Sequence, residues 1–262
     1  MNPAMDEAMR ETGRPRRRGR ILGLASVFLP IVLLLFIARL NHAPTLALPD
    51  AQVHAPPSES VQIAAIQMRW NVKDYATQDT FRARIEGLVA AAREKSTSAD
   101  PLLVVFPEDV GAPLYFLGAN GAVCELTSLR AASAAVAKRN LLSVLYKRFM
   151  HDVSLNRALG LALGPQVGET YISTFSNAAR KYGVYIIAGS APIPDFALAR
   201  DGSAITFKAQ SPDVYNASYF FGPDGRIIGS QRKVYPIPLE QAGGLDLTSG
   251  SLDRLEVFDT PF

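Results

Sequence analysis

Leu102-Leu-Val-Val-Phe-Pro-Glu108 is the stretch that decides the fold, a short apolar run that ends in a proline and a carboxylate. Uninterrupted apolar runs of this length are typical of strands buried on both faces of a parallel sheet. A similar run precedes it at residues 61–68, and between the two runs apolar residues recur with helical spacing over residues 81–92. Strand, helix and strand in this order predict a β-α-β unit and therefore an α/β fold.

The same alternation continues towards the C-terminus. Residues 175–183 end a helical pattern on a glycine, and residues 184–188 predict another buried strand. Residues 214–221 and 226–229 flank the turn sequence Gly222-Pro-Asp-Gly225, which predicts a hairpin. In the longer region before these elements, apolar spacing predicts a helix over about residues 126–149.

The first 40 residues differ in composition from the rest of the chain. Residues 1–20 hold six arginines against three acidic residues, and residues 21–40 form an apolar run in which Arg39 is the only charge. A run of about 20 residues matches a membrane-spanning helix. The positive-inside rule then places residues 1–20 in the cytoplasm and the domain outside it, as a single-pass membrane protein. The alternative is a cleaved secretory signal, whose apolar core is usually shorter, about 7 to 15 residues.

The proline-containing residues 41–60 predict a linker, which leaves one folded domain over residues 61–262. The net charge of +3 comes from the N-terminal tail, and no basic stripe follows, so we exclude nucleic acid as a partner. The three histidines lack metal-ligand spacing, and no glycine-rich segment opens a helix as a phosphate loop would. We therefore predict neither a metal nor a cofactor.

Five segments, in this order, resemble the nitrilase or carbon-nitrogen hydrolase superfamily. They are residues 61–68, Phe106-Pro-Glu108, residues 179–190, the hairpin that leads to Arg232-Lys233, and residues 255–262, which are similar to the strand and turn before the family's nucleophile. The resemblance implies a four-layer α-β-β-α sandwich, of which this chain would hold roughly the first half to two thirds. Family members often assemble into dimers and larger forms, so a homo-oligomer stays open.

The resemblance also implies a Glu-Lys-Cys triad. It assigns Glu108 as the general base, Lys233 as the group that stabilises the oxyanion, and Glu240 as a second glutamate that positions substrate and lysine. A thiolate would attack the carbon of a small amide, nitrile or carbamoyl substrate, while the carboxylate relays the proton. The structural alternatives are that Glu108 is an acid stabilised at a helix start and that Lys233 is a solvated hairpin end.

Cys124 is the only cysteine of the chain. It precedes Lys233, whereas the family order is glutamate, lysine, cysteine, and its neighbours do not form a strand that leads into a sharp turn. We therefore interpret Cys124 as a structural thiol and expect no nucleophile in this chain. We expect an open sheet edge, and a pocket that holds Glu108 and Lys233 with no thiol within bonding reach.

Three functions stay open at this point. The first is a membrane-anchored carbon-nitrogen hydrolase whose cysteine is absent from this chain. The second is acyl transfer to an amine, similar to that of the apolipoprotein N-acyltransferases, which have several spanning helices where this chain shows one apolar run. The third is a catalytically inactive fragment or scaffold protein.

Overall fold

The computed structural model describes residues 30–48, 60–96, 99–119, 129–199 and 204–262. The chain divides into two compact units, residues 1–42 and residues 43–262. In the first unit, residues 30–40 are helical, while the arginine-rich tail and residues 21–29 lie outside the described residues. None of the described helices combines the length and the apolar character that crossing a membrane requires.

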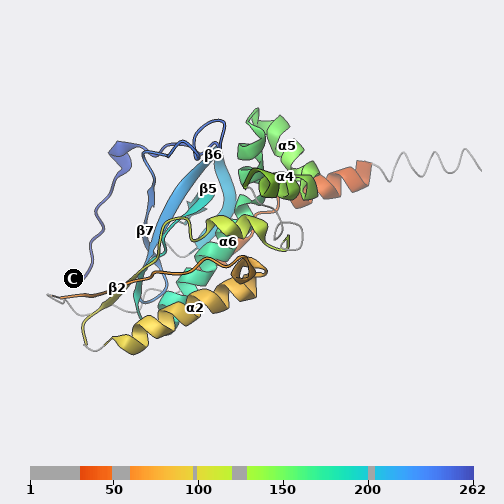
Figure 1. Ribbon diagram of the computed structural model, residues 1–262. Coiled ribbons are helices and arrows are strands. Elements are labelled where there is room, and N and C mark those ends of the chain that lie inside the picture. The colour runs from red at the N-terminus through yellow and green to blue at the C-terminus, as the bar shows by residue number, and fades with distance from the viewer. Residues whose placement is uncertain (1–29, 49–59, 97–98, 120–128, 200–203) are drawn as a thin grey trace, which may run out of the picture. The chain divides into compact units, whose positions relative to one another are not determined.

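Seven strands of the second unit form one mixed sheet (Figure 1). The main path of the sheet runs through β1 (Thr45–Ala47), β6 (Ala204–Phe221), β4 (Tyr185–Ile187), β3 (Leu102–Val105) and β2 (Gln62–Ala65), and β5 (Ala191–Leu198) and β7 (Ile227–Arg232) also pair with β6. Strands β2, β3 and β4 are parallel, which confirms the predicted β-α-β unit. The antiparallel pair of β6 and β7 confirms the predicted hairpin.

Two long helices connect the parallel strands and lie side by side against the sheet (Figure 1). Helix α2 (Gln78–Lys95) begins at a capping box formed by Thr77 and Thr80, and the predicted apolar stripe is its buried face. Helix α6 (Leu155–Tyr182) begins at Ser154, whose hydroxyl accepts a hydrogen bond from the Arg157 backbone. It ends at Gly183 in the left-handed conformation, as the sequence predicts.

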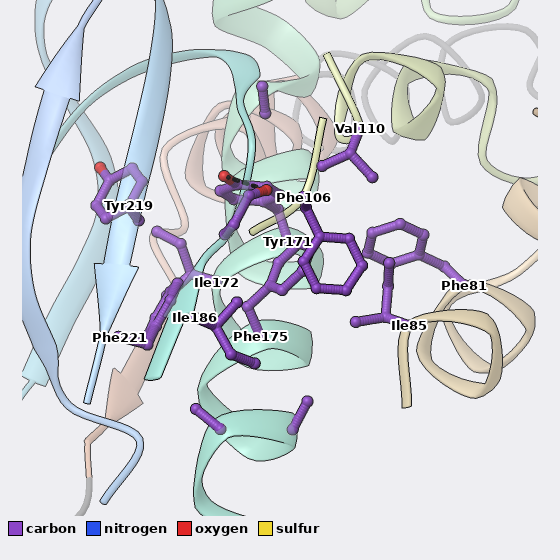
Figure 2. Close-up of a cluster of buried hydrophobic side chains, with 14 of the residues drawn as sticks. Phe81, Ile85, Phe106, Val110, Tyr171, Ile172, Phe175, Ile186, Tyr219 and Phe221 are labelled. Carbon is purple, nitrogen blue, oxygen red and sulfur yellow. Dashed lines mark hydrogen bonds between the residues drawn. The ribbon is translucent and has the colours of Figure 1, made fainter. Parts of the chain in front are cut away.

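An aromatic layer fills the space between these helices and the sheet (Figure 2). Phe175 of α6 makes edge-to-face contacts with Phe81 of α2 and with Phe106, at centroid distances of 6.2 and 5.0 Å. Burial of each such ring contributes about 1.5–3 kcal/mol. Because Phe106 directly follows β3, this packing fixes the end of the strand that carries Glu108.

The helix predicted over residues 126–149 is two helices in the structure. They are α4 (Leu129–Arg139) and α5 (Leu141–His151), and residues 126–128 lie outside the described part. The break is at Asn140, whose side-chain amide donates to the Val136 carbonyl at 2.9 Å and so satisfies the end of α4. Leu142 and Phe149, two of the apolar residues whose spacing predicted this helix, are 65% and 86% exposed. The spacing therefore predicted helical structure correctly, but as one helix in place of two.

Two expectations about the start of the domain are also corrected. Within the predicted linker, Thr45–Ala47 forms β1 and pairs with β6, because the prolines stand outside the paired residues; residues 49–59 are not described. We expected the strand within residues 61–68 to be buried on both faces, but β2 lies at the end of the sheet's main path and Ile63 is 65% exposed. Among the described residues, no strand pairs with the outer side of β2.

The strand expected within residues 255–262 is not formed. This segment follows a short 3-10 helix, Leu252–Arg254, and is irregular because no neighbouring strand pairs with it. It is held instead by aromatic contacts, of which the edge-to-face contact of Phe262 with Tyr185 at 4.9 Å is the shortest.

Candidate active site

Glu108 stands at the carboxyl end of β3 on a tight turn that the segment after β4 holds in place. The next residue, Asp109, has a φ of 60°, which is unusual for a residue with a side chain. Its backbone N–H donates to the Ser190 hydroxyl at 2.8 Å, and the Gly111 N–H donates to the Ser190 carbonyl at 2.9 Å. Gly189 is in the left-handed region, and a Cβ there would lie 2.0 Å from the Pro107 carbonyl oxygen. The two strand ends therefore fix each other and the position of Glu108.

Lys233 follows β7 and points its ammonium group at two carboxylates. Its Nζ lies 2.8 Å from Oε1 of Glu108 and 2.7 Å from Oε2 of Glu240. Backbone hydrogen bonds to Asn216 and Gly250, at 2.9 and 2.8 Å, hold Lys233 itself. The structure thus brings together all three residues that the sequence proposed, although Glu108 and Lys233 are 125 positions apart.

Asn216 of β6 completes this cluster, and the sequence analysis gave it no role. Its Nδ2 donates to Glu240 Oε1 at 2.7 Å and to Glu108 Oε1 at 3.1 Å. The Ile237 backbone N–H donates to the other oxygen of Glu240 at 2.8 Å. Asn216 and Glu240 are both 3% exposed. An asparagine among the mostly apolar residues 214–221 was the available sign, because buried amides require polar partners.

The family model for carbon-nitrogen hydrolases matches residues 62–262. The chain belongs to the carbon-nitrogen hydrolase family. No curated protein matches this carbon-nitrogen hydrolase significantly.

Several solved structures are similar to this carbon-nitrogen hydrolase. A carbon-nitrogen hydrolase from Helicobacter pylori G27 is 18% identical with a TM-score of 0.40, and the match covers 73% of this chain and 45% of that one. The NitFhit protein of C. elegans is 13% identical with a TM-score of 0.38, covering 77% of this chain and 35% of that one. Nit3 of Saccharomyces cerevisiae, a member of branch 10 of the nitrilase superfamily, is 17% identical with a TM-score of 0.32, covering 81% and 50%. The chain spans half or less of the length of each of these structures.

The charged groups of the site stabilise one another in their ionised forms. Burial by itself favours a lower pKa for Lys233, but hydrogen bonds to Glu108 and Glu240 outweigh it and raise the pKa above its ordinary value. Burial by itself favours a higher pKa for Glu240, but hydrogen bonds from Lys233, the Ile237 backbone and Asn216 leave the pKa lowered. Near neutral pH, Lys233 is therefore an ammonium and Glu240 a carboxylate.

Asp109 adds a third carboxyl group to the site. Burial, and then the negative charges of Glu108 and Glu240, raise the pKa of Asp109 above its ordinary value. Oxygens of Glu108, Asp109 and Glu240 lie within 4.8 Å of one another, as the ligands of a cation would. Lys233 already binds two of these three carboxylates, so we assign the cluster to the ammonium group of Lys233.

The charged site is open to solvent on the side of Glu108, whose side chain is 58% exposed. A pocket of about 310 Å³ lies there, and its walls include Phe106, Ile187 and Gln231 besides Glu108 and Lys233. This confirms the predicted pocket. Cys124 lies outside the described residues, so the expectation that no thiol reaches the site stays a prediction.

We expect the coupling of Glu240 to Lys233 to appear in the pH dependence of stability. Because the pKa of Glu240 is lowered on folding, its contribution is complete above the unfolded value of about 4.3 and is lost as the pH falls through the folded value. At pH 7, Glu240→Gln should therefore lower the free energy of unfolding, and the difference from the wild type should shrink on acidification. Urea unfolding from pH 7 to pH 3 measures this difference. Glu94→Gln, at an exposed position of α2, is the control, and an equal effect of both variants would contradict the prediction.

Proposed function

We propose that the protein hydrolyses carbon-nitrogen bonds of an amide, nitrile or carbamoyl compound with a Glu-Lys-Cys triad. Glu108 is the general base, Lys233 stabilises the oxyanion, Glu240 positions Lys233, and a cysteine is the nucleophile. The observation that carries the proposal is the 2.8 Å contact between Lys233 Nζ and Glu108 Oε1 inside a solvent-accessible pocket. The structural alternatives of a solvated lysine and a helix-starting acid do not account for the buried, fully hydrogen-bonded Glu240 beside them.

The chemistry on an amide proceeds in two halves. In the first, the thiol transfers its proton to Glu108 while its sulfur bonds to the carbonyl carbon; the C–N bond then breaks and Glu108 protonates the departing amine. In the second, Glu108 takes a proton from water, whose oxygen displaces the sulfur to give the acid and restore the thiol. An ammonium has three N–H donors, and Glu108 and Glu240 use two of those of Lys233. The third can bind the oxyanion in both halves.

An assay of the whole gene product tests this proposal. We expect ammonia release from simple amides, and its loss in Glu108→Gln. Acyl transfer to a lipoprotein amine in place of ammonia release would favour the acyltransferase alternative. Absence of both reactions from a folded protein would leave the inactive scaffold as the better interpretation.

Three further features belong to the proposal. We infer that a second sheet covers the side chains of Leu103, Val105 and Ile187, which are apolar and only half-buried, and so completes a four-layer α-β-β-α sandwich.

We also infer that residues 21–40 anchor the protein in a membrane with residues 1–20 in the cytoplasm, on the basis of the apolar run and its arginine-rich flank. A homo-oligomer is compatible with this arrangement. Protease treatment of intact spheroplasts should degrade the domain, and its protection would contradict the exoplasmic location.

A further inference from the structure

A second pocket, of about 240 Å³, lies next to the charged site and takes no part in the chemistry proposed above. It is bounded by helices α4 and α6, by the segment after Glu108 and by the loop around Glu240. Most of its lining side chains are apolar, among them Phe116, Val136, Leu159, Val214, Leu239 and Leu247.

The few polar groups of this pocket are mostly bound to protein. The Tyr115 hydroxyl donates to the Pro192 carbonyl at 2.5 Å, and the Asn156 amide donates to the Gly244 carbonyl. Among the described residues that line the pocket, Asp109 alone is charged. The pocket therefore favours an apolar occupant, because a polar one would lose its hydration without gaining partners.

The pocket adjoins the charged site along two segments of the chain. Asp109 and Leu239 line it, and they are the chain neighbours of Glu108 and Glu240. The carboxylates of Asp109, Glu108 and Glu240 approach within 4.8 Å of one another. A molecule whose reactive carbon lies near Lys233 can therefore extend an attached group past Asp109 into the apolar space.

We propose that this pocket binds the acyl group of the substrate and that the acyl group is apolar. The inference rests on the proposed function, in which the acyl group stays bound through both halves of the reaction. The amine leaves after the first half, and the exposed side of Glu108 gives it a path to solvent. At about 30 Å³ for each water-sized group, a pocket of 240 Å³ holds roughly eight non-hydrogen atoms. The negative charge of Asp109 disfavours acyl groups whose chain carries a carboxylate, because like charges repel.

A chain-length series tests the substrate class. With the whole gene product, kcat/KM should rise from acetamide to hexanamide by up to about fourfold for each added methylene. The monoamide of adipic acid, which places a carboxylate at the far end, should be a poorer substrate than hexanamide. An equal or higher kcat/KM for the charged amide would overturn the inference while the hydrolase function stands.

A variant that fills the pocket tests the location. Ser133 of α4 lines the pocket, and Ser133→Phe should lower kcat/KM about tenfold more for hexanamide than for acetamide. Ala134→Phe is the matched control, because Ala134 is the next residue of the same helix and is exposed. Leu245→Ala enlarges the same pocket and should shift the preferred acyl chain to a longer one, which keeps the test usable if Ser133→Phe fails to fold.

Binding separates this inference from the proposed function. Saturation-transfer NMR with hexanamide should detect binding to the 262-residue chain, weakened about tenfold by Ser133→Phe and unaffected by Ala134→Phe. Binding with this pattern in a protein that releases no ammonia would remove the proposed function and keep the pocket assignment. Equal effects of the two phenylalanine variants would overturn the assignment.

Discussion

Lys233→Met is expected to reduce kcat/KM about a thousandfold. Methionine has a similar length, but it removes the N–H donor that stabilises the oxyanion, and loss of one such donor lowers the rate by about 10²–10³. It also removes the cation that holds Glu108 in place at 2.8 Å. Single-turnover measurement of acyl-enzyme formation locates the defect in the first chemical step. An increase in KM with an unchanged kcat would contradict this role of Lys233.

The same substitution should reverse the pH dependence of stability around Glu240. The Glu240 side chain is 4% exposed, and without Lys233 its charge is buried with no opposite charge in contact. Removal of one partner of a buried pair destabilises by about 3–5 kcal/mol. Because desolvation then raises the pKa of Glu240 on folding, its contribution is present below the unfolded value and is lost as the pH rises through the folded value.

Urea unfolding of Lys233→Met at pH 4 and pH 7 measures this reversal. We expect the variant to lose stability relative to the wild type mainly at pH 7. Lys181→Met is a matched control, because Lys181 forms an ion pair with Glu86 but is 56% exposed. Solvent screens exposed ion pairs, so this control should change little. Equal losses in the two variants would show that burial of Glu240 does not set the effect.

The elements that the sequence predicted correctly are those with strong local signals. Strands β3 and β4 are continuous apolar runs, and the hairpin of β6 and β7 has proline and glycine in its turn. Strand β5 contains Pro192 and Pro194, which argue against a strand, yet it pairs with β6 along its length with shifts of register. Pairing with a long neighbouring strand overrode the local signal in that case.

The residues of the candidate site were likewise predicted only where a local sequence signal exists. Glu108 and Lys233 follow recognisable strands, so their approach could be predicted from the resemblance of ordered segments. Asn216 could not be assigned a role, because its two carboxylate partners come from distant segments and meet it only in the folded chain. The strain at Asp109 was equally invisible, since it depends on a hydrogen bond to Ser190, 81 residues away. Polar networks of this kind depend on tertiary structure and leave little periodic pattern.

Gly189→Ala is expected to destabilise the protein by about 3 kcal/mol. The φ of 68° at Gly189 disfavours any residue with a Cβ by roughly 1–2 kcal/mol. In addition, the new Cβ would lie 2.0 Å from the Pro107 carbonyl oxygen, a backbone atom that cannot turn away. Forced overpacking of this kind destabilises by about 1–3 kcal/mol. The thermal unfolding midpoint and urea unfolding both report the loss.

Gly183→Ala separates the two causes. Gly183 has a similar φ of 59°, but nothing lies within 4 Å of the Cβ that alanine would add, so only the conformational term remains. We expect this control to lose about 1 kcal/mol and to keep its activity. Gly189→Ala should also lower kcat in the molecules that fold, because relief of the clash moves Pro107 and with it Glu108, away from the Lys233 ammonium. If both variants were equally stable, the contact between the ends of β3 and β4 would not be what holds Glu108 in place.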